Sequence, residues 1–259
     1  MYKIKFHDVT LISNKKKVQK NNIIFFFYGI GCRSDDFIFL FKSIVKTKYQ
    51  LLIAELPGHN YNLKQTNYGL EQFTKNIFLF IKKKNMKNII FFTHSVGGIV
   101  PILLAKKYLK KKLFKKFINY EGNLTHYDTL TVTKKTSLYK KNEFGKKFKK
   151  LIYLCENSND LALKKWSKSL KKTSSDAFYN ISRDAVYFSQ SNKLLEFFRS
   201  YFPKKIYLYG SKSKLFFSEF LFGSIRYKIY DCGHFSFYED MPKFRCFFNK
   251  LIIERNYKK

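Results

Sequence analysis

The stretch Phe91–Gly98 reads FFTHSVGG and continues an apolar run that begins at Ile89. An apolar run that stops at a small hydroxyl residue followed by glycines predicts a buried strand that passes directly into a helix. After the serine, apolar residues recur at helical spacing at Val96, Ile99, Val100, Leu103 and Leu104. Ser95 is therefore expected at a rigid junction between a strand and a helix.

Strand and helix patterns alternate along most of the chain. Apolar runs predict strands at 21–29, 49–56, 87–94, 115–122, 204–210 and 226–234, and the alternating segment 2–12 predicts one or two edge strands. Helices are predicted at 36–47 and 69–84, near 216–222, and in a last segment that ends near 253. This alternation predicts the α/β class, with a mostly parallel central sheet and helices on both of its faces.

Residues 123–202 interrupt the alternation. The segment is polar and rich in lysine, with helix-like pieces at 160–170 and 183–202. An excursion of this length between two core strands is more typical of a folded unit than of a structureless loop. The sequence thus predicts a core formed by residues 1–122 and 203–259 and a helical cap inserted at 123–202.

The chain is strongly basic. Its 259 residues include 51 Lys and Arg but only 18 Asp and Glu, which gives a formal net charge of +33. Such a charge is typical of proteins that bind nucleic acid or anionic membranes. The lysines occur as short scattered runs, and Phe (30) and Tyr (19) are also abundant, so the whole sequence has drifted in composition. We therefore expect no specific nucleic-acid partner.

The cysteines and the start of the chain indicate a reduced, cytoplasmic protein. Cys32, Cys155, Cys232 and Cys246 form no CxxC pair and have no histidine at metal-ligand spacing, so no zinc site, other cofactor or disulfide framework is predicted. Residues 1–14 alternate apolar and polar side chains and do not resemble a signal peptide. No window has the length of apolar sequence that spans a bilayer.

Thr93–Gly97 closely resembles the G-x-S-x-G nucleophile elbow, in which a tight turn after a strand presents a serine above the sheet. Four further segments follow the same family order: FFFYGIG at 25–31, AELPGHN at 54–60, INYEGN at 118–123 and YDCGHFSFYEDMPKF at 230–244. Together these motifs resemble the α/β-hydrolase superfamily over nearly the whole chain. The resemblance implies an α/β-hydrolase fold with a catalytic triad.

The chemistry of a serine nucleophile requires a base, and imidazole is the side chain best suited to this role near neutral pH. The chain has five histidines. His234 follows the last predicted strand in a Gly-His-Phe turn, where its ring can reach Ser95. The other four lie in the first strand, in the PGH turn, beside the serine and at the start of the cap: His7, His59, His94 and His126. We predict that His234 is the base.

The acid of the triad has more than one candidate in the sequence. In this family it commonly follows the seventh strand, but here no carboxylate occurs there until Glu219. The haloalkane dehalogenase-like group places the acid after the sixth strand, where this chain has Glu121. Glu121 is favoured over Asp231, which precedes His234 too closely to reach around its ring, and over Glu219.

The resemblance also implies an oxyanion hole formed by the backbone N–H groups of Ile30 and Val96. Three residues depart from the family pattern. Thr93 is β-branched and is expected to crowd the elbow, Tyr28 replaces a histidine that normally supports the oxyanion turn, and Pro101 should kink the helix after Ser95.

The resulting hypothesis is a lidded serine hydrolase that cleaves a carboxylic ester or thioester through an acyl-enzyme. Aromatic residues in the cap suggest an apolar acyl or aryl group, although ordinary packing produces the same pattern: Tyr179, Tyr187, Phe188 and Phe197. The alternatives are an acyltransferase or C–C bond hydrolase with the same triad, and a ligand-binding protein without turnover. The expected partner is a small ester or acyl compound, which an acidic carrier protein could present.

Overall fold

The computed structural model describes residues 1–44, 47–65, 67–108, 110–213 and 225–253. An eight-stranded sheet runs through it in the order β1-β2-β4-β3-β5-β6-β7-β8. The strands are β1 (Tyr2–Phe6), β2 (Val9–Ser13), β3 (Asn21–Phe27), β4 (Gln50–Ala54), β5 (Lys87–His94), β6 (Phe114–Tyr120), β7 (Lys205–Gly210) and β8 (Ile225–Ile229). The six strands from β3 to β8 are parallel, whereas β2 pairs in the antiparallel sense with both of its neighbours, β1 and β4.

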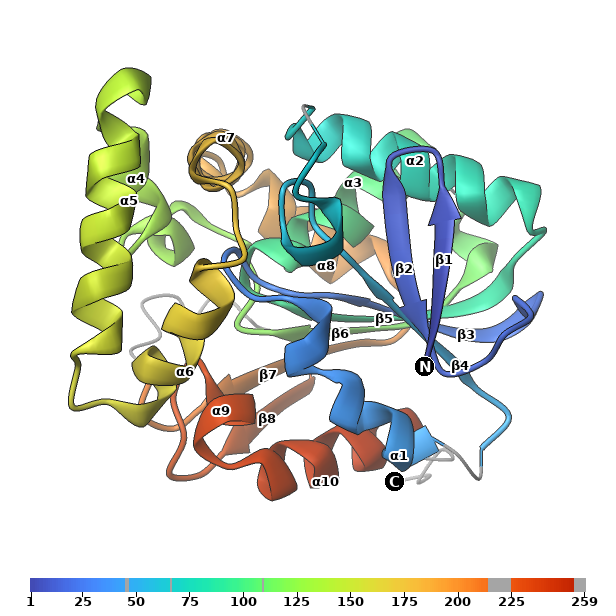
Figure 1. Cartoon of the computed structure of the whole chain (residues 1–259). Coiled ribbons are helices and arrows are strands. Elements are labelled where there is room, and N and C mark those ends of the chain that lie inside the picture. Colours follow the sequence, from blue (N-terminus) through green and yellow to red (C-terminus); the bar gives the residue numbers. More distant parts are fainter. Residues whose placement is uncertain (45–46, 66, 109, 214–224, 254–259) are drawn as a thin grey trace.

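Helices cover both faces of the sheet and its carboxyl edge. They are α1 (Phe41–Ile44), α2 (Leu70–Lys83), α3 (Ile99–Lys107), α4 (Thr133–Ser137), α5 (Lys141–Glu156), α6 (Leu161–Leu170), α7 (Ser175–Ser189), α8 (Lys193–Tyr201), α9 (Ser236–Glu239) and α10 (Met241–Ile253). Figure 1 shows α2 and α3 on one face, and α1, α9 and α10 on the other. The predicted α/β class, with a mostly parallel sheet between helical layers, is confirmed.

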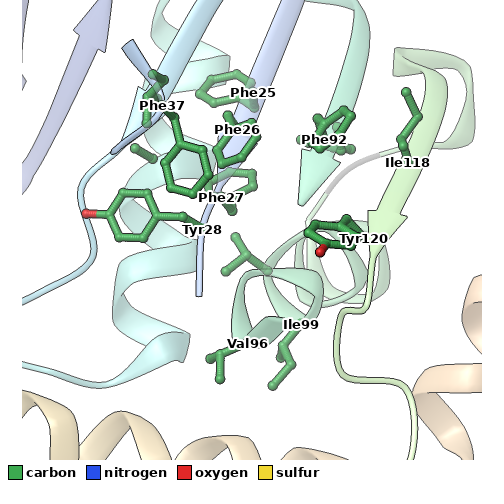
Figure 2. Packing of buried hydrophobic residues seen from close by; sticks show 14 of the residues in the cluster. Phe25, Phe26, Phe27, Tyr28, Phe37, Phe92, Val96, Ile99, Ile118 and Tyr120 are labelled. Atoms are coloured by element: carbon green, nitrogen blue, oxygen red, sulfur yellow. The ribbon is translucent and has the colours of Figure 1, made fainter. Parts of the chain in front are cut away.

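The central strands are apolar on both sides because each of their faces meets a helical layer. Two successive residues of β5 show this directly, because they point to opposite faces of the sheet. Phe91 packs against Phe117 on one face, whereas Phe92 packs against Phe244 and Phe248 of α10 on the other. Figure 2 shows this core, with Val96 and Ile99 of the helix after β5 in the same apolar cluster as the strand residues.

The segment between β6 and β7 contains the helices α4 to α8. The helix-like pieces at 160–170 and 183–202 correspond to α6, to the second half of α7 and to α8. In α8, Phe198 packs on Phe117 of the sheet, and the helix also contacts α3. By its contacts α8 therefore lies in the layer that covers the sheet, while α4 to α7 lie at the left end in Figure 1.

Three sequence predictions fall wholly or partly outside the described residues. The helix expected near 216–222 lies outside them, as does the alternative acid Glu219. The helix expected at 36–47 is described up to residue 44, where it forms two short 3-10 turns followed by α1. Among the described residues, no helix combines the length and apolar character needed to cross a membrane.

Candidate active site

Ser95 occupies a strained turn at the carboxyl end of β5. The strand ends at His94, and a 3-10 turn over Ser95–Gly98 leads into α3. The φ angle of Ser95 is 53°, a left-handed conformation that is costly for a residue with a side chain. Such strain is the mark of a nucleophile elbow, because the turn projects the side chain out of the sheet.

Gly97 is required because the helix after the elbow lies directly against β3. A Cβ atom at this position would stand 2.2 Å from the backbone oxygen of Phe27. Gly29 allows a second close approach, since its Cβ would lie 2.7 Å from Cβ of Ser95. The glycines of the two motifs therefore let the turn at Ser95 and the turn at 28–31 touch.

Replacing Gly97 by alanine is expected to destabilise the protein by about 3 kcal/mol, because the contacted atom is backbone and cannot move aside cheaply. The matched control is Gly145→Ala in α5, where nothing lies within 4 Å of the added Cβ. That change should stabilise the helix by about 0.5–1 kcal/mol. Urea unfolding of both variants measures the two effects, and equal effects would contradict this account of Gly97.

Glu121 and His234 form a hydrogen-bonded pair. Nδ1 of His234 lies 2.7 Å from Oε2 of Glu121, and the N–H of Gly210 donates to the other oxygen, Oε1, at 2.8 Å. Burial alone would raise the pKa of Glu121, but the hydrogen bond and electrostatic attraction of His234, together with hydrogen bonds from Ser213 and Gly210, outweigh it, so that the pKa is lowered. The carboxylate is thus held charged behind the imidazole ring.

Asp231 has a different environment. Its side chain is 86% exposed, and its charged partner is Lys243, whose Nζ lies 3.9 Å from Oδ2. Of the candidate acids within the described residues, Glu121 is the one that contacts His234.

One cavity of about 520 Å³ brings the predicted residues together. Ser95, His234 and Glu121 line it, as do both predicted oxyanion residues, Ile30 and Val96. Among the described residues, no hydrogen bond joins Oγ of Ser95 to the ring of His234. Catalytic hydrogen bonds commonly tighten only when a substrate is bound, so the arrangement is compatible with proton transfer.

The Thr93 side chain, which was expected to crowd the elbow, has a polar partner. The Thr93 hydroxyl donates to Oδ1 of Asn119 at 2.7 Å, and Nδ2 of Asn119 donates to the backbone oxygen of Gly122 at 3.3 Å. Asn119 therefore links the elbow to the turn that carries Glu121. Sequence reasoning missed Asn119, and its position two residues before Glu121 within a buried strand was the available signal.

Tyr28 forms a buried pair with Glu55. Its hydroxyl donates to Oε2 of Glu55 and accepts from the N–H of Leu56 at 3.1 Å. Glu55 also accepts from the N–H of Ser34 at 3.2 Å. Burial raises the pKa of Glu55 to about 7, against the lowering effect of these donors. Tyr28 is thus joined, through Glu55 and Leu56, to the turn that follows the neighbouring strand β4.

Glu55 should make stability depend on pH. Its folded-state pKa lies above the ordinary value of 4.5, so its contribution is fully present below pH 4.5 and is lost as pH rises toward about 7. The loss amounts to about 3 kcal/mol at about 1.4 kcal/mol per unit. Between pH 4.5 and 7, the free energy of unfolding of Glu55→Gln should therefore fall by about 3 kcal/mol less than that of the wild type. Urea unfolding across this range tests it, and parallel curves would contradict it.

Two buried neutral histidines hold the site, and sequence reasoning assigned neither a role. Nε2 of His59 accepts from the N–H of Gly31 at 3.0 Å, while Nδ1–H donates to Pro57 O at 2.8 Å. Burial lowers the pKa of His59 to about 4. Nε2–H of His94 donates to the carbonyl of His234 at 3.0 Å, and burial lowers the pKa of His94 as well. Both rings thereby position the loops around Ser95. The positions of these histidines in the PGH and THS motifs could have indicated this role from the sequence.

Pro101 stands at the third position of α3, within its first turn. Proline is tolerated in the first turn of a helix because the N–H it lacks has no helical partner there. The 3-10 turn that begins at Ser95 continues directly into α3. The proline therefore lies just beyond the point where the 3-10 turn becomes an α-helix.

The cap aromatics highlighted in the sequence do not line the cavity. Tyr179 is buried and donates its hydroxyl to the backbone of Tyr139, and Tyr187 is exposed. Phe188 packs edge-on against Tyr187, and Phe197 stacks on Tyr201. These residues serve packing or face solvent. The cavity's aromatic lining is a different set: Tyr127, Trp166, Tyr207 and Phe235.

No family model matches the chain. A Mycoplasma genitalium protein provisionally named esterase/lipase 2 is 29% identical over 93 residues, which cover 35% of each protein. The match thus spans about a third of the curated relative's length.

Solved structures resemble almost the whole chain. MenH from S. aureus has a TM-score of 0.71 at 15% identity, with 92% of this chain and 96% of that one covered. An esterase from Exiguobacterium antarcticum has a TM-score of 0.70 at 12% identity, with 97% and 99% covered. At these identities the likeness concerns the fold.

Proposed function

The chain has the α/β-hydrolase fold, and from this premise we propose that it is a serine hydrolase that cleaves a carboxylic ester or thioester. The observation that carries the proposal is the buried Glu121 carboxylate bonded to His234 in the cavity that Ser95 lines. A site that only bound a ligand would not need a strained serine and an oriented imidazole at one point.

In the proposed reaction, Ser95 Oγ attacks the carbonyl carbon while Nε2 of His234 takes the hydroxyl proton. Glu121 holds the ring by Nδ1 and stabilises the imidazolium. The N–H groups of Ile30 and Val96 stabilise the negative oxygen of the tetrahedral intermediate. The imidazolium then returns the proton to the departing alcohol or thiol, which leaves an acyl-Ser95 ester.

Water completes the cycle. His234 takes a proton from a water molecule, whose oxygen attacks the acyl carbon, and the carbon–Oγ bond breaks as the proton passes to Oγ. The products are a carboxylic acid and free Ser95. An acyltransferase would use another nucleophile in place of water at this step, and product analysis with and without an added alcohol distinguishes the two reactions.

The proposal is tested by covalent labelling. A fluorophosphonate probe should add to Ser95 of the folded protein, with the mass increase located on the peptide that contains the elbow, and a panel of p-nitrophenyl esters of increasing chain length should be hydrolysed. Urea-unfolded protein is the control and should not react. An absence of adduct on folded protein, or an adduct elsewhere, would count against the assignment.

The acidic carrier protein and the cytoplasmic location stay predictions from the sequence. A carrier-borne thioester would bind through the excess of lysine, so its affinity should fall steeply with salt. A free ester of the same acyl group would show little salt dependence.

A further inference from the structure

We propose that Asp128 selects the substrate by accepting a hydrogen bond from a donor group, a hydroxyl or an ammonium, that lies near the ester carbonyl. The inference rests on the proposed function and names a class of substrate for the same cavity. It is carried by one carboxyl oxygen that has no partner among the residues that the structure describes.

Asp128 lies seven residues after Glu121, in the 3-10 turn His126–Thr129 that opens the cap segment, and it lines the cavity with Ser95 and His234. Its Oδ2 accepts from the N–H of Leu124 at 2.8 Å and from the N–H and hydroxyl of Thr125 at 2.7 and 3.2 Å. The contact from the Thr125 N–H is one half of a capping box, in which the N–H of Asp128 donates to the Thr125 side chain in return, and the box fixes the Asp128 side chain.

The second oxygen of Asp128 has no such role. Across the described ranges, no hydrogen bond or ion pair reaches Oδ1. Two carboxylates line the described part of the cavity, and both oxygens of the other one, Glu121, are taken by His234 and Gly210. Oδ1 of Asp128 is thus the carboxyl oxygen that remains for a ligand.

The surroundings make this oxygen selective. The side chain is only partly exposed, and burial raises the pKa of Asp128 to about 7. Apolar residues line the same cavity: Val132, Leu163, Trp166 and Phe235. A substrate that displaces water without replacing its hydrogen bond leaves Oδ1 unsatisfied, which costs about 1–3 kcal/mol. Esters with a suitably placed donor should therefore bind about 10-fold more tightly than esters without one.

The test measures binding without turnover. In a Ser95→Ala background, dissociation constants are determined for benzyl butanoate, benzyl 3-hydroxybutanoate and benzyl 3-aminobutanoate. Trp166 is the one tryptophan of the sequence and lines the cavity, so its fluorescence reports occupancy. We expect one or both donor-bearing esters to bind about 10-fold more tightly than the plain ester. The hydroxyl and ammonium arms identify which donor is preferred.

Asp128→Asn separates selection from capping. Its amide oxygen can keep the capping contacts while its NH₂ replaces the acceptor Oδ1 by a donor, so the preference should fall to about 1 or reverse. Thr125→Val removes both contacts of the Thr125 hydroxyl with Asp128 and should lower stability but keep the preference. Asp176→Asn, on the exposed side of α7, controls for the loss of charge.

Three results would overturn the inference. They are equal affinities for the three esters, failure of all three to bind, and a preference that survives in a folded Asp128→Asn protein. The outcome is separate from that of the proposed function. If wild-type protein hydrolyses no ester while the donor preference depends on Asp128, the hydrolase proposal fails and the role of Asp128 stands. If Ser95-dependent hydrolysis is found without a donor preference, the hydrolase proposal stands and the role of Asp128 fails.

Discussion

Replacing Ser95 by alanine is expected to lower kcat for ester hydrolysis by about 10⁵-fold, because the nucleophile is lost and the remaining groups can only polarise the bound ester. Alanine keeps the Cβ atom of serine, so the cost of the left-handed backbone at residue 95 is unchanged and little change in fold stability is expected. Steady-state kinetics on the best ester of the panel, with the thermal midpoint measured in parallel, provides the comparison.

The matched control is Ser200→Ala, on the exposed surface of α8. It should leave kcat within about twofold of the wild type, as surface substitutions usually do. Hydrolysis that persists in the Ser95→Ala protein at more than about a tenth of the wild-type rate would mean that another nucleophile, or a contaminating enzyme, performs the reaction.

Replacing Glu121 by glutamine is expected to lower kcat by about 10³- to 10⁴-fold. Glutamine is nearly the same size, but it carries no charge to stabilise the imidazolium. Its NH₂ group can also face Nδ1 of His234, in which case the ring takes the wrong tautomer. KM should change far less than kcat, because Glu121 acts through His234 and the loss concerns the transition state.

Asp231→Asn is the control for this variant, since it removes the rejected candidate acid, which is exposed and does not contact His234. It should keep kcat within about twofold. A large loss in Asp231→Asn together with a small loss in Glu121→Gln would reassign the acid.

Glu121→Gln should also change how the stability of the protein depends on pH. The pKa of Glu121 is lowered on folding, so its stabilising contribution is present above the unfolded value near 4.5 and is lost as pH falls through the folded value. Wild-type protein should therefore lose stability relative to Glu121→Gln on acidification below about pH 4.5. Urea unfolding at several acidic pH values checks the sign.

Much of the fold could be predicted because its strands and helices follow from the local pattern of apolar and polar residues. The apolar runs of β3 to β6 and the helical spacing of α2 reveal strands buried on both faces and helices that cover them. The helix α5 was not predicted, although Phe144, Phe148 and Cys155 form its buried side. Its many lysines hide the spacing, since long charged side chains occupy most of the remaining positions.

The partners of the unusual residues could not be predicted. Tyr28 and Thr93 looked like defects of their motifs, but the fold places Glu55 and Asn119 opposite them. A buried polar group needs its partner in space, and a sequence shows only its neighbours along the chain.

By itself, the sequence determined the α/β class, the order of the motifs and the elbow at Ser95, because period and turn chemistry act over a few residues. The resemblance favoured Glu121 as the acid, but its contact with His234 was decided by the tertiary structure, since the two residues lie 113 positions apart and the contact depends on how β6, β7 and β8 are placed beside one another. The tertiary structure also decided that Asp128, and not the cap aromatics, lines the cavity. Side chains from distant segments meet only where sheet register and helix packing bring their backbones together, and no local pattern records that distance.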